Sequence, residues 1–198
     1  MDAIDTPEQW YAYRDAMRSL VVKSKRGDVK IPAIDTVMVK RNLVRANTYN
    51  PNSMPDQKVE DLIQSILLSG VAYGVAAWWD PDLDQFVIVD GFHRWLVLGY
   101  DHLGLDYIPI VPLDLTAAGR MMATWQFNKA RGFHEVDLDA DLIRALIGQG
   151  VPEEEICERL GIDLDTVYRY KQLTGIAELF QTATYSMAWE MVEVVDGD

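Results

Sequence analysis

The sequence lacks what a cross-linked, metal-rich or membrane-bound protein would need. Cys157 is the only cysteine among 198 residues, and there are three histidines. A single thiol excludes an intrachain disulfide framework and a multi-cysteine zinc site, and it favours a reducing compartment. No apolar run approaches the roughly 18 residues that span a bilayer, and the acidic start has no signal-peptide pattern. We therefore expect a cytoplasmic protein without membrane contact.

Positive charge is also scarce. Lys and Arg total 18 against 31 Asp and Glu, which gives a net charge of −13. Such a chain repels polyanions at long range, so indiscriminate coating of nucleic acid is nearly excluded. Between Lys23 and Arg45, however, seven basic residues face two acidic ones. This stretch is a solvated surface, a contact for a DNA backbone, or extra positive potential for the phosphates of a nucleotide, and the sequence leaves the three readings open.

Residues 1–30 are predicted to form a helix followed by a basic linker. Thr6 and Gln9 match a capping box, and Pro7 suits the first helical position. The helix is expected to run out near Lys23 to Gly27. Its apolar stripe is predicted to dock onto the main domain rather than bind a partner, and consists of Trp10, Tyr13, Met17 and Leu20.

Residues 31–132 alternate in pattern between strands and helices, which indicates an α/β domain. The Val-rich stretch 34–44, the stretch 71–79, the apolar run 86–90 and residues 107–115 read as strands. Helices are expected at 56–68, where Ser69 and Gly70 end the pattern, after Gly91, and at 117–130.

Residues 133–180 read as an all-helical domain, and residues 181–198 as a tail. Helices are expected at 137–148, 152–160 and 164–173, with a turn that opens on Gly161. This spacing is typical of a helix-turn-helix, with a generic helical hairpin as the alternative. Eleven acidic residues face four basic ones from Phe133 to Phe180, so DNA reading and a role in packing or protein contacts both stay open. The candidate DNA-binding residues are Thr166, Tyr168, Arg169 and Lys171.

The segment V-D-G-F-H-R-W, Val89 to Trp95, carries the most chemical information. A buried strand ends at Asp90, turns on Gly91 and opens a helix that bears His93 and Arg94. Such turns present backbone N–H groups to anions, and Arg adds donors that suit phosphate. A phosphate site is one interpretation. The other is structural, with Arg94 paired to Asp90 and His93 part of the core.

The order of the motifs resembles the ParB family, within the ParB/sulfiredoxin superfamily, over roughly residues 36–175. The motifs are N-x-Y-N-P-N at 47–52, a helix ending at Gly70, D-G-x-H-R-W, an I-P-I strand, N-x-x-R-G at 128–132 and the helix-turn-helix. The resemblance implies a mixed α/β nucleotide-binding domain, a DNA-reading helical domain, and homodimers. It also implies a nucleoside triphosphate, CTP or ATP, with Mg²⁺.

The resemblance also assigns residues. Gly91, His93 and Arg94 match the family box that holds the triphosphate of CTP. Asn128 and Arg131 match the second box, in which Asn128 would contact the metal. The nucleotide-binding candidates are Gly70, Gly91, His93, Arg94, Asn128 and Arg131, and the catalytic candidates are Asp90 and His93.

Three departures from the family pattern shape the functional hypotheses. Phe92 and Phe127 replace the two Glu residues of the boxes, and Leu96 replaces an Arg, which brings CTP hydrolysis into question because phenylalanine cannot coordinate Mg²⁺. The D-G-x-H-R form resembles ParB-like proteins of phages and mobile elements and the free serine kinases. The first hypothesis is a nucleotide-binding, DNA-associated regulator or partition-like factor. The alternatives are a small-molecule or nucleotide kinase and a non-catalytic interaction protein with a degenerate loop.

Overall fold

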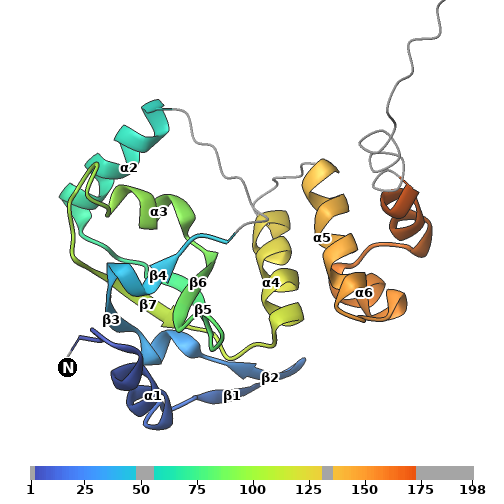
Figure 1. The fold of residues 1–198 in the computed structure, drawn as a ribbon, viewed down its shortest axis with the longest axis horizontal. Coiled ribbons are helices and arrows are strands. Elements are labelled where there is room, and N and C mark those ends of the chain that lie inside the picture. Colours follow the sequence, from blue (N-terminus) through green and yellow to red (C-terminus); the bar gives the residue numbers. More distant parts are fainter. Residues whose placement is uncertain (1–2, 48–55, 131–135, 173–198) are drawn as a thin grey trace, which may run out of the picture.

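The computed structural model describes residues 3–47, 56–130 and 136–172. A mixed α/β domain comes first along the chain, and a bundle of helices follows it (Figure 1). The predicted fold class, a mixed α/β domain followed by a helical domain, is therefore confirmed. In the part of the chain that the structure describes, no helix is long and apolar enough to cross a membrane.

The α/β domain is built on a five-stranded sheet with the order β3-β7-β5-β6-β4. Neighbours β5 and β6 form an antiparallel hairpin, whereas β5 pairs parallel with β7 and β6 pairs parallel with β4. Strand β3 closes the other edge, antiparallel to β7. The strands are β3 (Val37–Lys40), β4 (Val44–Arg45), β5 (Val75–Asp80), β6 (Gln85–Asp90) and β7 (Tyr107–Pro112).

Strand β6 is the most deeply buried strand of the sheet. Its four residues from Phe86 to Val89 are all buried, as expected of a strand covered on both faces. Phe86 and Ile88 enter the main apolar core of the domain, while α4 (Ala117–Ala130) contacts the strand as well. The predicted helices at 56–68 and 117–130 are confirmed as α2 (Asp56–Ser69) and α4.

The predicted strand at 34–44 is wrong in part, because two short 3-10 turns interrupt it. The first turn, η1 (Pro32–Asp35), begins at a proline whose fixed φ favours a turn. The second, η2 (Arg41–Leu43), separates β3 from β4. Its first residue, Arg41, donates from Nη1 to the carbonyl of Trp95 at 2.7 Å, which draws the chain out of the sheet.

The N-terminal helix α1 (Pro7–Asp15) has the predicted capping box and docks onto the sheet. Trp10 is 3% exposed. Its ring lies 4.6 Å from that of Phe86 and 5.7 Å from that of Trp79, measured between centroids. Because aromatic pairs at such distances stabilise a core beyond their buried area, α1 is an integral part of the α/β domain.

The predicted extension of this helix to Lys23–Gly27 is wrong. The helix ends at Asp15, and residues 21–30 form a two-stranded hairpin of β1 (Val21–Ser24) and β2 (Gly27–Lys30). The cause lies in the turn between helix and hairpin, where Ser19 has a φ of +47°. A helix cannot continue through that conformation.

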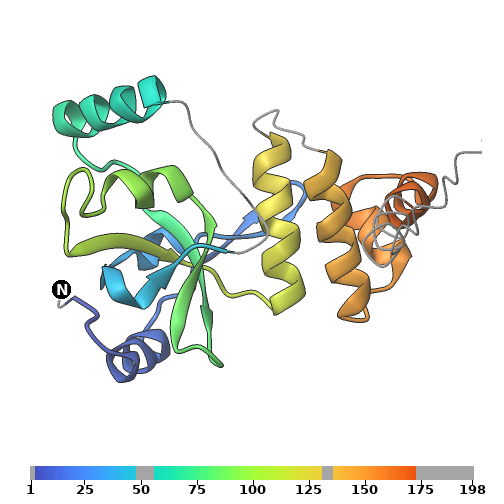
Figure 2. The same cartoon turned by 45° about the horizontal axis from the view of Figure 1, so that its top comes forward.

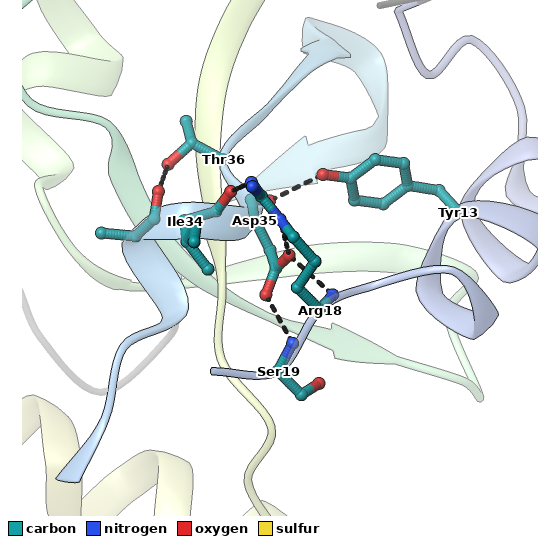
Figure 3. Close-up of polar contacts among 7 residues, drawn as sticks. Tyr13, Arg18, Ser19, Ile34, Asp35 and Thr36 are labelled. Atoms are coloured by element: carbon teal, nitrogen blue, oxygen red, sulfur yellow. Dashed lines mark hydrogen bonds and ion pairs between the residues drawn. The ribbon is translucent and has the colours of Figure 1, made fainter. Parts of the chain in front are cut away.

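A buried carboxylate holds this turn in place (Figure 3). Asp35 is 3% exposed, and its carboxylate accepts the backbone N–H groups of Arg18 at 2.9 Å and Ser19 at 3.1 Å. The Arg18 guanidinium lies 3.7 Å from the same carboxylate and donates to the carbonyl of Ile34. The Tyr13 hydroxyl donates to the Asp35 carbonyl at 3.0 Å, and its burial near this carboxylate raises the pKa of Tyr13.

The helical part has its own core, which begins inside α4. Helix α4 lies between the sheet on one side and α5 (Val136–Gly148) and α6 (Glu153–Leu160) on the other (Figures 1 and 2). Residues 164–172 form one more helix. The buried residues of this core are Met121, Met122, Trp125, Leu142, Ile143, Leu146, Ile156, Leu160 and Val167.

We expect Asp35→Ala to lower the free energy of unfolding by about 3 kcal/mol, because the backbone N–H groups of Arg18 and Ser19 lose a buried, charged acceptor. Urea denaturation of the full chain measures the change. Asp15→Ala is the matched control, since its carboxylate is 75% exposed and lies 3.4 Å from Nη2 of Arg14. It should cost less than about 0.5 kcal/mol. Equal losses for the two variants would contradict the role assigned to Asp35.

Candidate functional site

The turn from β6 into α3 (Phe92–Val97) depends on Gly91. Gly91 has a φ of +94°, in the left-handed region that glycine adopts at no steric cost. A Cβ atom at this position would lie 2.8 Å from Nη2 of Arg94 and 3.2 Å from its Nε. The guanidinium of Arg94 therefore lies directly over the glycine backbone, and a side chain at this position would displace it.

Arg94 is ion-paired with Asp90 across this turn. Its Nη2 lies 3.5 Å from Oδ2 of Asp90, and the two side chains are 24% and 16% exposed. This is the structural interpretation of the D-G-x-H-R motif that the sequence left open. The guanidinium has five N–H donors in a fixed fork, and about a quarter of the Arg94 side chain is exposed to solvent beside the turn.

His93 and Phe92 lie on the inner side of the turn. The Nε2 atom of His93 is buried, and its ring lies 5.7 Å from the ring of Phe92. Phe92 and Trp95, with ring centroids also 5.7 Å apart, pack against the main core. Phe92, which the resemblance compares with a Glu, therefore serves the core.

Arg41 supports α3 from below, a role that was not predicted from the sequence. The Arg41 guanidinium lies 4.5 Å from the centroid of the Trp95 ring, and burial lowers its pKa. A Cβ at Gly99 would meet Arg41 Nη2 at 2.5 Å, so Gly99 makes room for the guanidinium. Arg41 was counted in the basic stretch, but it supports the α3 turn from inside. The sequence signals this supporting role of Arg41 only by placing a basic residue between two strands.

Two of the remaining nucleotide candidates, Gly70 and Asn128, lie in the described part of the chain, at the end of α2 and on α4. Gly70 ends α2 with a φ of +76°. Asn128 is half-buried near the end of α4, and among the described residues no hydrogen bond connects it to Gly91. Asn47, which begins the N-x-Y-N-P-N motif, donates from Nδ2 to the Ile88 carbonyl of β6 at 3.0 Å. The rest of that motif and Arg131 lie outside the described residues.

The described residues do not fit the magnesium site that the ParB resemblance implies. Magnesium is held by carboxylates and other oxygen donors in octahedral geometry. Within residues 3–47, 56–130 and 136–172, no group of three His, Cys, Asp or Glu side chains could hold a metal ion. Phe127, which the resemblance compares with a metal-binding Glu, is a 40% exposed apolar side chain, and the Asp90 carboxylate is ion-paired with Arg94.

The second candidate site is the turn between α6 and the helix at 164–172. Gly161 ends α6 in the left-handed conformation with a φ of +61°. Asp163 then accepts the N–H of Thr166 at 2.6 Å, and hydrogen bonding to the side chain and the backbone of Thr166 lowers the pKa of Asp163. Val167 is fully buried and fixes the helix to the core. This is the helix, turn and helix that the sequence predicts.

The candidate DNA-binding residues lie on that helix. Tyr168, Arg169 and Lys171 are exposed, and Thr166 is half-buried. Arg169 Nη2 donates to the Thr166 hydroxyl at 3.2 Å. Lys171 lies over the ring of Tyr168, and its Nζ donates to Oε1 of Glu153 at 2.5 Å. This bond raises the pKa of Lys171. One of the four candidate DNA-binding residues is therefore ion-paired with a glutamate of α6.

Comparisons with known proteins agree with this division of the chain. Residues 134–182 match the family described as the IbrB-like C-terminal HTH domain. The uncharacterized protein YbdM of Escherichia coli (strain K12) is 35% identical over 161 residues, which cover 79% of this chain and 77% of YbdM. The chain thus combines an α/β domain with a helix-turn-helix domain. It belongs to the same family as YbdM.

Two solved structures of the chromosome-partitioning protein ParB from Caulobacter crescentus are also similar. The complex with CTP-gamma-S is 22% identical, covers 71% of this chain and 78% of that chain, and has a TM-score of 0.43. The complex with the centromeric parS site is 20% identical, covers 73% and 74%, and has a TM-score of 0.45.

We expect Gly91→Ala to destabilise the fold by about 1–2 kcal/mol or more, because the left-handed backbone disfavours a Cβ and Arg94 occupies its space. Gly148→Ala is the matched control, since nothing lies within 4 Å of a Cβ there. Thermal unfolding of both variants measures the difference. A neutral Gly91→Ala would show that the turn does not need glycine.

Proposed function

We propose that this protein binds duplex DNA through the helix at 164–172, as a DNA-associated regulator or partition-like factor. One observation carries the proposal. A left-handed Gly161, an Asp163 cap and a buried Val167 place Tyr168, Arg169 and Lys171 on the exposed side of the second helix of a helix-turn-helix. Such a helix enters the major groove, where Arg and Lys meet bases and phosphates.

Acidic residues at the start of α6 weaken the contact between the helix at 164–172 and DNA. Glu153, Glu154 and Glu155 occupy the first turn of α6, where they favour the helix dipole. Glu153 also holds Lys171, and Arg159 Nη2 lies 3.0 Å from Glu155. The acidic turn therefore opposes tight binding to arbitrary DNA, and sequence-dependent contacts have to supply the affinity.

We expect Arg169→Ala to weaken binding to a specific duplex about tenfold or more, as the loss of a base or phosphate contact does. Glu153→Gln should strengthen binding several-fold at low salt, because it releases Lys171 and removes a repelling charge. Fluorescence anisotropy of the full chain with labelled fragments measures both. Glu158→Gln is the control for the loss of an α6 carboxylate. Unchanged affinity in Arg169→Ala would contradict the proposed recognition helix.

We propose, as a second function, that the Gly91 turn holds a nucleotide phosphate. Support comes from the left-handed Gly91 and from the partly exposed guanidinium of Arg94 above it. The phosphate would compete with Asp90 for Arg94, and His93 would line the inner side. The proposal includes neither a metal-dependent step nor a role for Asn128 in holding Mg²⁺. Whether CTP or ATP binds, and whether NTPase or kinase chemistry follows, are further hypotheses.

Titration calorimetry with CTP, ATP, GTP and ADP tests this second function. We expect one nucleotide to bind with a Kd below about 1 mM, or roughly −4 kcal/mol, and Arg94→Ala to abolish the binding. Arg94→Lys is the companion variant, because it keeps a charge over Gly91 while it loses the planar fork. A Kd above about 1 mM for each of the four nucleotides would contradict the proposed phosphate site.

We also propose that the protein forms a homodimer, that it originates from a phage or mobile element and that it is cytoplasmic. We propose domain limits at residues 30, 132 and 180. We further propose that Gly70 and Arg131 contribute to the nucleotide site.

A further inference from the structure

The hairpin of β1 and β2 stands apart from the main sheet with both faces open. All ten residues from Val21 to Lys30 are exposed, and no other described strand pairs with either β1 or β2. Val21, Val22 and Val29 are 45–48% exposed. An exposed ribbon of this kind contributes little to the core, so its presence calls for a partner outside the fold.

The structure nevertheless fixes this ribbon firmly at its root. Asp35 holds the backbone of Arg18 and Ser19 just before β1 (Figure 3), and Ile31 donates its N–H to the Leu20 carbonyl at 2.8 Å just after β2. Lys30 lies 3.0 Å from Asp114, in the segment that leads into α4. The hairpin is therefore held in one position relative to the rest of the molecule.

The charge of the hairpin is opposite to that of the chain. Four basic residues and one acidic residue lie between Val21 and Lys30, in a chain whose net charge is −13. Lys25 and Arg26 form its tip. Cross-strand partners share a face, so Lys23 and Lys30 lie on one face with Val21 and Asp28. Among the described residues, no ion pair engages Lys23, Lys25 or Arg26.

These features favour binding of the hairpin to an anionic partner over its pairing with a second copy of this chain. Lysines along both strands oppose edge-to-edge pairing, whereas the major groove of duplex DNA admits a two-stranded ribbon. In both views the hairpin extends from the sheet toward the side on which α4, α5 and α6 lie (Figures 1 and 2). We propose that the β1–β2 hairpin is a second DNA contact, whose Lys23, Lys25 and Arg26 bind phosphates of the duplex. This inference rests on the proposed DNA-binding function.

The hairpin contact differs from the recognition helix in what it reads. Lysines and arginines that bind phosphates position a protein on DNA and release counterions, without sequence preference. The acidic helical part repels the duplex, so a basic ribbon beside it supplies attraction that the recognition helix lacks. Loss of the hairpin charges should weaken binding equally on every sequence.

The salt dependence of DNA binding by the full chain tests the hairpin. We expect the double substitution K25A/R26A to weaken binding roughly tenfold or more at about 100 mM salt, and to reduce the slope of log K against log salt by about 2, on specific and random duplexes alike. The charge-conserving exchange K25R/R26K should bind as the parent does. Lys58→Ala removes an exposed charge from α2 and should leave the slope unchanged.

Each outcome separates the hairpin from the recognition helix. If K25A/R26A keeps the affinity and slope of the parent while Arg169→Ala loses affinity, the hairpin proposal is overturned and the recognition helix stands. Tighter binding by K25A/R26A also overturns it. In that case the ribbon is occupied by an acidic segment such as residues 173–198, which hold five acidic and no basic residues. If the parent chain binds no duplex, both proposals are overturned.

Discussion

Helix α4 is the element on which the arrangement of the whole molecule depends. Its Met121, Met122 and Trp125 belong to the core of the helical part, while the helix also contacts β6 of the sheet. Lys129, near its end, lies 4.4 Å from the Trp125 ring centroid and donates to the carbonyl of Leu160 at 2.9 Å. Gln126 donates to the carbonyl of Arg159 at 2.6 Å. These bonds satisfy the last carbonyls of α6, which have no partner within their own helix.

This shared helix gives the two candidate sites a common support. The Gly91 turn follows directly from β6, and the turn at Gly161 follows directly from α6. Helix α4 contacts both elements. Because packed interiors deform little, the helix at 164–172 and the Gly91 turn are held as parts of one framework. The hairpin at Val21–Lys30 is fixed to the same framework through Asp35 and Asp114.

The sequence predicted elements well where local signals agree with the tertiary structure. The capping box of α1, the limits of α4 and the left-handed Gly161 were all legible, because capping, apolar periodicity and glycine act within a few residues. The hairpin was missed because nothing local ends α1 at Asp15. The turn that follows is held by Asp35, which is 20 positions beyond Asp15, through the backbone N–H groups of Arg18 and Ser19, and no local pattern encodes these bonds.

The residues of the candidate sites could be predicted from the sequence, but most of the charged and aromatic side chains that contact them could not. The D-G-x-H-R turn was found, and the Asp90–Arg94 pair was foreseen as one of two readings because i, i+4 spacing permits it. The stacking of Arg41 on Trp95, 54 positions apart, and the capture of Lys171 by Glu153 were not foreseen. Both need the fold to bring distant residues together, so a charge count along the chain misjudges which basic side chains can meet an anion.

Amide chemical-shift mapping of the full chain with a random-sequence duplex at low salt tests most directly the central claim, that this molecule binds DNA through the helix at 164–172 and the β1–β2 hairpin. The account predicts that the shifts concentrate in residues 164–172 and in the β1–β2 hairpin, with none in α2. Shifts confined to other surfaces, or no shifts at all, would contradict it.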